Sequence, residues 1–302
     1  MSPRRPGLAD VAPWLFVLLW STGFVGAKFG LPYAEPFTLL LIRMLLTLAV
    51  FLCLILWFKS PWPTLPQAGH QLVVGALVHG AYLGGVFAAI KLALPAGVTS
   101  LLVGLQPVLT AVFGWLWLGD RLRLRQWIGL GLGVVGVALV LLSGRQLALF
   151  QIQPAALAFA GLALVGISLG TVYQKRFGAG VSLLTGTFCQ YVATAILMAV
   201  LAFAFERRQV VWHPHLVGAL LWLVFGLSLS AILLLMLMIR HGQTARVASY
   251  FYLVPPVTAL ETWLVFGEHL APLGLVGMAA AATGVYLVLR PGGGTVCRPR
   301  RP

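Results

Sequence analysis

Three ionisable side chains lie inside long apolar stretches of the sequence: Arg43, His79 and Glu261. Charge in an apolar stretch is costly, so such residues are usually paired or functional. Arg43 can bind an anion, Glu261 can bind a cation, and His79 can hydrogen bond a polar ligand or exchange a proton near neutral pH. Tyr82 follows His79 by three positions and shares its helical face. This set predicts ligand binding, ion pairing or proton exchange.

Each of these residues also has a purely structural interpretation. Arg43 can extend along its helix to the outer headgroups. Glu261 can be a hydrogen-bonded structural carboxylate, and His79 can be a neutral histidine bonded to a neighbouring helix. If their helices span a membrane, Arg43 and Glu261 are expected to lie at similar depths below its outer surface. We therefore hypothesise that they pair across the bundle and act in gating, or that one of them binds a zwitterionic substrate.

Aromatic and amide side chains complete the candidate substrate-binding set, which is Trp20, Phe24, His79, Tyr82, Gln106 and Tyr250. Trp20, Phe24 and Lys28 follow one another at four-residue steps, so they share one helical face. Lys28 is near the outer end of its segment, where we expect it to reach the headgroups. Tyr250 also fits the aromatic belt of a membrane interface.

Two prolines occupy corresponding places in the chain, Pro107 and Pro255. A proline inside a membrane helix frees a backbone carbonyl and permits a kink. We predict that these prolines act as hinges. Kinked packing without any hinge motion is the alternative.

Enzyme chemistry has little support. Residues 166–170 fit G-x-S-x-G around Ser168, but that motif works at a strand-to-helix turn, and here it lies in an apolar stretch. The sequence contains no H-E-x-x-H and no P-loop, and its three cysteines lack metal or disulfide spacing. We expect no enzyme activity, no metal and no cofactor. A membrane enzyme built around Ser168 is the least favoured alternative.

Membrane-spanning helices are the elements that would position these residues. Hydrophobic residues make up 60% of the 302 positions and charged residues 9%, against roughly 25% charged in soluble domains. Ten segments reach the length of about 20 apolar residues that a spanning helix needs. They are 11–30, 36–58, 68–91, 95–118, 123–143, 154–176, 182–205, 215–240, 245–267 and 270–290.

The net charge of +14 comes from small clusters of Lys and Arg between these segments. Such clusters are typical of topology determinants and not of a nucleic-acid-binding face. With a cytoplasmic N-terminus, fourteen Lys and Arg fall inside and five outside, with Arg43 within a span. This bias predicts that both termini are cytoplasmic. We expect the Gly-, Pro- and Arg-rich tail at 291–302 to be disordered.

An internal repeat joins the two halves of the sequence. Residues 107–140 match residues 255–288 at a constant offset of 148, and the front of each half matches at an offset of 147. Five spans per half is an odd number, so the second half begins on the opposite side of the membrane. The loop at 120–125 carries three Arg and its counterpart at 268–273 carries none. We predict an all-α fold of ten transmembrane helices, as two inverted five-helix repeats at 1–146 and 147–290 around a central cavity.

Three stretches resemble the drug/metabolite transporter superfamily, EamA type. They are WSTGFVGAKFGLPYAEPFTLLLIRM at 20–44, PAGVTSLLVGLQPVLTAVFGWLWLGDRL at 95–122 and ARVASYFYLVPPVTALETWLVFGEHL at 245–270. The family usually has Glu at the end of the fourth span, where this chain has Asp120. The resemblance implies a central cavity lined mainly by spans 1, 3, 4, 6, 8 and 9, and the export of amino acids, other metabolites or drugs from bacteria.

The resemblance and the inverted repeat together predict a secondary transporter, working as an exporter of small metabolites by alternating access at a bacterial inner membrane. A channel or uniporter-like facilitator of the same architecture is the first alternative. The expected partners are a small-molecule substrate and the lipid bilayer, with no nucleic acid. A monomer is compatible with these expectations.

Overall fold

The computed structural model describes residues 8–118, 123–146, 153–230, 234, 253–269 and 271–289. Within these ranges the chain is helical, apart from loops and one isolated antiparallel bridge between Ala34 and Val210. The elements, with η marking π-helices, are α1 (Leu8–Gly30), α2 (Pro36–Phe58), α3 (Leu65–Val74), η1 (Gly75–Ala81), α4 (Tyr82–Lys91), α5 (Ala96–Val103), α6 (Gln106–Leu118), α7 (Leu124–Gln146), α8 (Pro154–Phe177), α9 (Leu183–Phe205), α10 (Pro214–Leu221), η2 (Trp222–Leu229), α13 (Val254–Phe266) and α14 (Pro272–Leu289).

Six helical segments are long and apolar enough to cross a bilayer: Pro36–Phe58, Leu65–Lys91, Ala96–Trp117, Leu124–Ser143, Pro154–Phe177 and Leu183–Phe205. Four shorter apolar helices accompany them at Trp14–Gly30, Pro214–Leu229, Val254–Phe266 and Pro272–Leu287. Large apolar side chains such as Leu56, Trp57 and Phe203 point away from the protein. A soluble surface would not expose so many, so the chain is a polytopic membrane protein with lipid around it.

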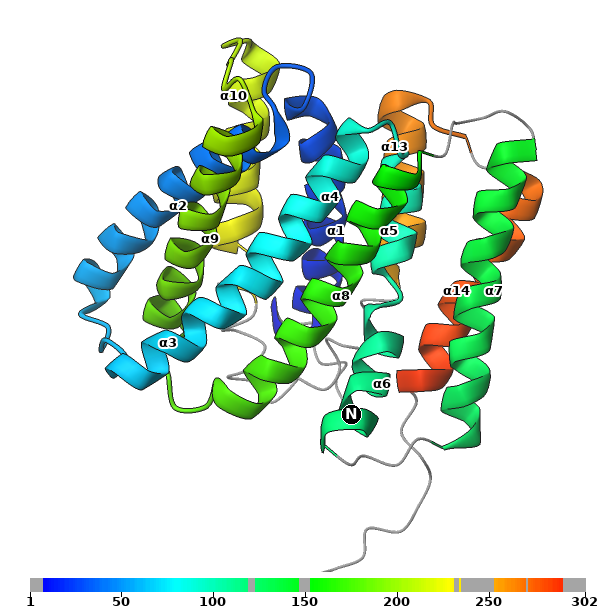
Figure 1. The fold of residues 1–302 in the computed structure, drawn as a ribbon, viewed down its shortest axis with the longest axis horizontal. Helices are drawn as coiled ribbons and strands as arrows, with labels where there is room; N and C mark the ends of the chain where they lie inside the picture. Colours follow the sequence, from blue (N-terminus) through cyan, green and yellow to red (C-terminus); the bar gives the residue numbers. More distant parts are fainter. Residues whose placement is uncertain are drawn as a thin grey trace, which may run out of the picture.

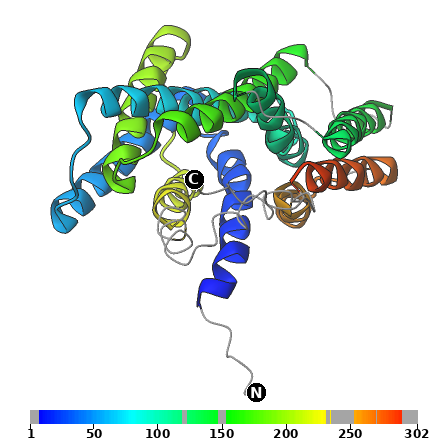
Figure 2. The same ribbon diagram turned by 90° about the horizontal axis from the view of Figure 1, so that it is seen from below.

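The helices form a wide bundle (Figure 1). α2 and α9 pack together on one side, α4 packs on α8 in the middle, and α7 pairs with α14 at the far edge. The view from below in Figure 2 shows α1 below the row that contains α2, α4, α8 and α9. The largest apolar core lies where α1, α2, α4 and η2 meet, around Phe24, Leu39, Phe87 and Leu223.

A π-helix interrupts the third apolar segment of each half. η1 begins at Gly75 and η2 begins at Trp222, which are 147 positions apart, the same offset as in the sequence repeat. η1 packs on α8 and α9, whereas η2 packs on α1 and α2. A Cβ atom on Gly75 would lie 2.2 Å from the carbonyl oxygen of Gln190. The backbones of η1 and α9 therefore touch directly, as only a glycine permits.

The segment expected as one helix at 95–118 is broken. α5 ends at Val103, Gly104 and Leu105 form a turn, and α6 begins at Gln106. Pro107 and Pro255 each lie in the first turn of a helix, where the missing N–H costs nothing. A Cβ atom on Gly104 would lie 2.5 Å from Cγ of Pro255, so the turn before α6 packs against Pro255.

Glycines also allow α7 and α14 to pack closely. A Cβ atom on Gly136 would lie 2.4 Å from the oxygen of Gly277, and one on Gly284 would lie 2.5 Å from the oxygen of Gly129. Small residues at such a crossing let two helix backbones approach without a hydrophobic driving force. The GLGLGVVG run at 129–136 therefore serves helix packing.

Candidate functional site

Arg43 lies in the interior of the bundle. α2 places it against η2, its side chain is 3% exposed, and Nη2 donates to Oγ of Ser228 at 3.1 Å. Nε and Nη1 are buried, and no described residue accepts a hydrogen bond from either. Arg43 therefore does not extend to the headgroups. Buried N–H donors without acceptors are costly and uncommon, so a missing partner is the natural explanation.

Aromatic and amide side chains lie near this guanidinium and contact one another. The ring of His79 stacks on Tyr191, with centroids 4.7 Å apart, and its Nε2 lies 3.2 Å from Oε1 of Gln190. Gln190 in turn donates through Nε2 to Oε1 of Gln71 at 2.6 Å. Tyr82 is buried and hydrogen bonds with Trp20.

Arg43 lies close enough to Tyr82, Tyr191 and His79 for its charge to act on these three side chains. We call the whole group the Arg43 cluster: Trp20, Arg43, His79, Tyr82, Gln190, Tyr191 and Ser228. Its members come from α1, α2, η1, α4, α9 and η2, and so from both halves of the chain. The structure thus gathers four residues singled out from the sequence, Trp20, Arg43, His79 and Tyr82.

The other candidate binding residues lie elsewhere. Phe24 is buried in the apolar core, one turn beyond Trp20 on α1. Gln106 at the start of α6 donates to Oγ1 of Thr171 at 3.2 Å and to Oγ1 of Thr110 at 3.4 Å. Gln106 therefore contacts α8, and neither of these hydrogen bonds involves a residue of the group around Arg43. Tyr250 lies outside the described residues.

Ser168 has a structural contact. It is fully buried on α8, and its hydroxyl donates to the carbonyl oxygen of Gln106 at 3.4 Å. This bond joins α8 to the start of α6. The serine sits in mid-helix, without the strand-to-helix turn that an exposed nucleophile of this motif requires.

A second polar centre lies on α13, at the half-buried Glu261. Its Oε1 lies 2.8 Å from Oγ of Ser21 on α1. Its Oε2 and the hydroxyl of Thr258, three residues earlier, are both buried and have no hydrogen-bond partner among the described residues. Arg43 and Glu261 do not form an ion pair in this conformation, since the salt bridge that the described residues form is elsewhere. Their roles in gating or substrate binding stay predictions.

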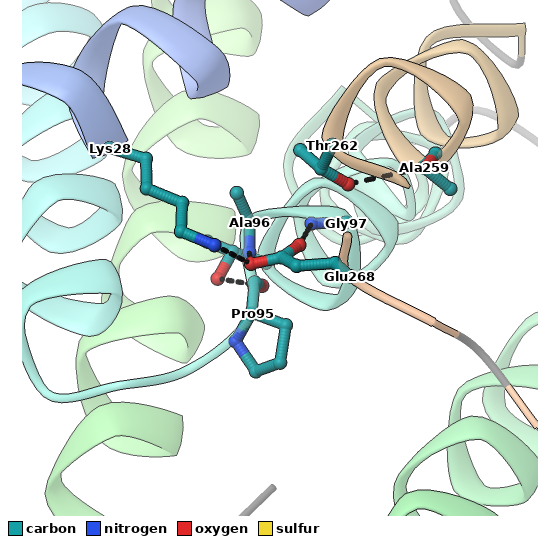
Figure 3. A network of polar contacts seen from close by, with 8 residues as sticks. Lys28, Pro95, Ala96, Gly97, Ala259, Thr262 and Glu268 are labelled. Atoms are coloured by element: carbon teal, nitrogen blue, oxygen red, sulfur yellow. Dashed lines mark hydrogen bonds and ion pairs between the residues drawn. The ribbon is translucent and has the colours of Figure 1, made fainter. Parts of the chain in front are cut away.

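That salt bridge joins Lys28 to Glu268, which lie 240 positions apart (Figure 3). Nζ of Lys28 is 2.5 Å from Oε1 of Glu268 and 4.4 Å from the ring centroid of Phe266. The sequence did not indicate this partner of Lys28, because the carboxylate comes from a distant segment. Glu268 also accepts hydrogen bonds from the N–H groups of Ala96 at 3.3 Å and Gly97 at 3.4 Å.

This carboxylate therefore holds three elements together at one end of the bundle: the end of α1, the start of α5 and the end of α13. A negative charge at a helix N-terminus also satisfies free N–H donors and the helix dipole. Figure 3 shows the carboxylate between the Lys28 ammonium and the first turn of α5.

Sequence reasoning missed several contact residues. Glu206, at the end of α9, accepts hydrogen bonds from the N–H groups of Phe37 and Thr38 and from the hydroxyl of Thr38, each at 2.7 Å. It caps α2 from the other half of the chain, which no local capping pattern predicts. Gln190 could have been found, because it occupies the position that corresponds to Arg43 at the offset of 147. Ser21 and Ser228 carry no sequence signal.

No group of three or more His, Cys, Asp and Glu side chains that could hold a metal ion occurs in the part of the chain that the structure describes.

Known proteins resemble the chain over nearly its whole length. It is 29% identical over 280 residues to the uncharacterized transporter YvbV of Bacillus subtilis (strain 168), covering 90% of this chain and 88% of that protein. It is 25% identical over 289 residues to a probable amino-acid metabolite efflux pump of Salmonella typhimurium, covering 90% and 92%. It is 24% identical over 273 residues to the uncharacterized inner membrane transporter YedA of Escherichia coli (strain K12), covering 90% and 87%.

A solved crystal structure, described only as that of a protein, has a similar fold, with a TM-score of 0.63 and 23% sequence identity over 92% of this chain and 95% of that one. The family model that matches describes the EamA-like transporter family, and it matches twice, at residues 9–142 and 145–290. Together these matches cover almost the entire sequence, so the chain belongs to the EamA-like transporter family.

Proposed function

We propose that this protein is a secondary transporter that exports small metabolites carrying a carboxylate, such as amino acids, by alternating access around the Arg43 cluster. The buried guanidinium carries the proposal. Two of its nitrogens have N–H groups without an acceptor among the described residues, and the planar guanidinium suits two-point binding of a carboxylate. The rings of Trp20, Tyr82 and Tyr191 offer apolar surface for the rest of the substrate.

The proposed architecture has ten spans in two inverted five-helix repeats. Contacts that recur at the repeat offset support it. Between α7 and α14, Gly136 contacts Gly277 and Gly129 contacts Gly284. At an offset of 148, Gly284 is the counterpart of Gly136 and Gly277 is the counterpart of Gly129. Replacing each residue by its counterpart therefore turns one contact into the other. Such an exchange is what a two-fold axis between the halves produces, and an axis in the membrane plane is typical of transporters with inverted repeats.

The front of each half supplies a second recurring contact. The hydroxyl of Thr38 donates to Glu206 at 2.7 Å, and that of Thr185, its counterpart at an offset of 147, donates to the carbonyl oxygen of Pro61 at 2.8 Å. In both cases the segment after the second span of one half meets the start of the second span of the other. Contacts of the same kind thus join the halves in both directions, which supports a shared interface between two repeats.

Direction and location rest on sequence features and on relatives. Export is proposed because the Salmonella relative is named an efflux pump. A bacterial inner membrane is proposed because the Escherichia coli relative is named an inner membrane transporter. We propose that both termini are cytoplasmic, because the loops on the same side of the membrane as the termini carry most of the Lys and Arg.

An uptake screen in proteoliposomes tests the function. The purified chain is reconstituted, and labelled amino acids and small amphiphiles are offered one at a time at two pH values, with and without a pH gradient. A secondary transporter gives saturable uptake and accumulates substrate against its gradient. A facilitator of the same architecture equilibrates the substrate without accumulation. Failure to move any of these compounds contradicts the proposal.

A further inference from the structure

If the carboxyl of Glu261 is ionised, the hydroxyl of Ser21 faces two acceptor oxygens and has only one hydrogen to donate. Oγ of Ser21 lies 2.8 Å from the carbonyl oxygen of Leu18 and 2.8 Å from Oε1 of Glu261. A serine hydroxyl has one hydrogen to donate. If that hydrogen points at one acceptor, the other close oxygen contact needs a proton from elsewhere, and a backbone carbonyl cannot supply one.

A proton on Glu261 satisfies both contacts. The carboxyl then donates its O–H to Oγ of Ser21, and Ser21 donates to the carbonyl oxygen of Leu18, as a serine in a helix commonly does. Every short contact at this point is then a hydrogen bond with a donor and an acceptor. The ionised form leaves two negative or partially negative oxygens facing each other at hydrogen-bond distance.

The surroundings of Glu261 also favour the neutral form. α13 packs chiefly against α1 and α5. α5 carries no titratable side chain, and Glu261 is the one titratable residue of α13. On α1, Lys28 is the titratable side chain whose position is described, and Glu268 already engages it. No cation of the described residues pairs with Glu261, and a carboxylate in a membrane protein without such a partner is costly enough to take up a proton instead.

We propose that Glu261 is the proton-binding site of this protein, and that the hydroxyl of Ser21 on α1 changes its hydrogen-bond partner with the protonation state of Glu261. Loss of the proton to water leaves a carboxylate that needs a donor, so the Ser21 hydroxyl turns from the Leu18 carbonyl to Glu261 Oε1. Taking up a proton from water on the other side reverses the change. Because α1 also carries Trp20 of the Arg43 cluster, the proton site and the proposed substrate site share one helix.

Infrared spectroscopy of the full chain in liposomes tests this proposal without any substrate. We expect a C=O stretching band of a protonated carboxyl that shifts in deuterated water and fades as the pH rises. Glu261→Gln removes this band, whereas the matched variant Glu268→Gln, which alters the ion-paired carboxylate, retains it. If Glu261→Gln does not fold, Ser21→Ala takes its place, and it keeps the band at a changed frequency because the carboxyl loses its hydrogen-bond partner.

Several results overturn the proposal: no protonated-carboxyl band at acidic pH, a band that survives Glu261→Gln, or a frequency that Ser21→Ala leaves unchanged. The outcome is separate from that of the proposed function. Arg43→Gln is expected to abolish substrate uptake and to leave the band in place. If the wild-type chain shows the band but moves no compound in the uptake screen, the result supports the proton site and contradicts the transport of those substrates.

Discussion

At the residue scale, the hydrogen bonds of the Arg43 guanidinium support the proposed binding of a carboxylate. A guanidinium has five N–H donors, and Ser228 accepts from Nη2 at 3.1 Å. Ser228 is itself anchored, because its hydroxyl donates to the carbonyl oxygen of Leu223 at 3.0 Å. η2 thus fixes one nitrogen of Arg43 and leaves Nε and Nη1 for a second acceptor.

The Ser228 contact gives a matched pair of variants. The hydroxyl of Ser230 donates to the carbonyl oxygen five residues earlier, as the hydroxyl of Ser228 does. Ser230 forms no described hydrogen bond with Arg43. Ser228→Ala removes an acceptor of a buried charge, which costs about 1–3 kcal/mol, so it should lower the thermal unfolding temperature. Ser230→Ala should leave that temperature nearly unchanged. Equal unfolding temperatures for the two variants would show that the Arg43 contact contributes nothing.

At the element scale, direct backbone contact explains why η1 lies where it does. The carbonyl oxygen of Gln190 occupies the space that a side chain at Gly75 would need. The hydroxyl of Thr194, one turn further along α9, also donates to the carbonyl oxygen of Gly75 at 3.1 Å. These contacts position His79 within η1 beside Gln190 and Tyr191 on α9.

Gly75→Ala should therefore destabilise the protein. Overpacking typically costs about 1–3 kcal/mol, which exceeds the gain of roughly 1 kcal/mol that alanine brings to a helix interior. Gly69→Ala, in the same apolar segment, is the control, because nothing lies within 4 Å of its Cβ position. Thermal unfolding of both variants in detergent checks the prediction. A Gly75→Ala protein as stable as Gly69→Ala would contradict the contact with Gln190.

The Lys28–Glu268 contact joins elements of the two halves at one end of the bundle. Lys28→Glu should lower the unfolding temperature, because two carboxylates would then face each other. The exchange Lys28→Glu with Glu268→Lys should restore only part of the loss. A lysine cannot accept the hydrogen bonds that Glu268 takes from Ala96 and Gly97. Full recovery in the double variant would show that these two bonds are unimportant.

Sequence periodicity predicted the helices well and their interruptions poorly. The expected span at 36–58 coincides with α2, and 182–205 differs from α9 by one residue at its start. The turn at Gly104 and Leu105 was missed because the apolar pattern continues through it. The π-helices were missed because they depend on packing against other helices. The partners of Lys28 and Glu261 lie 240 positions away, so no local pattern indicates them.

At the scale of the whole molecule, the proposed alternating access requires two halves that face opposite sides of the membrane. Residues 123 and 269 follow corresponding spans in the two halves, and both side chains are exposed. In a chain whose three cysteines are replaced by serine, Arg123→Cys and His269→Cys should react differently with a membrane-impermeant thiol reagent. His269→Cys should be labelled in intact cells, and Arg123→Cys only after permeabilisation. Labelling of both from the same side would contradict the inverted repeat.

The carboxylate site at Arg43 is the central claim, and substrate selectivity in proteoliposomes tests it most directly. Uptake of an amino acid identified in the screen is compared with uptake of the amine that lacks its carboxylate, using the wild-type chain, Arg43→Gln and the exposed control Arg123→Gln. A charge-assisted hydrogen bond contributes about 1.5–3 kcal/mol, so Arg43→Gln should reduce uptake by roughly tenfold or more. The wild-type chain should discriminate against the amine, and Arg123→Gln should match the wild type. Equal uptake of acid and amine, or equal loss in both variants, would contradict the account.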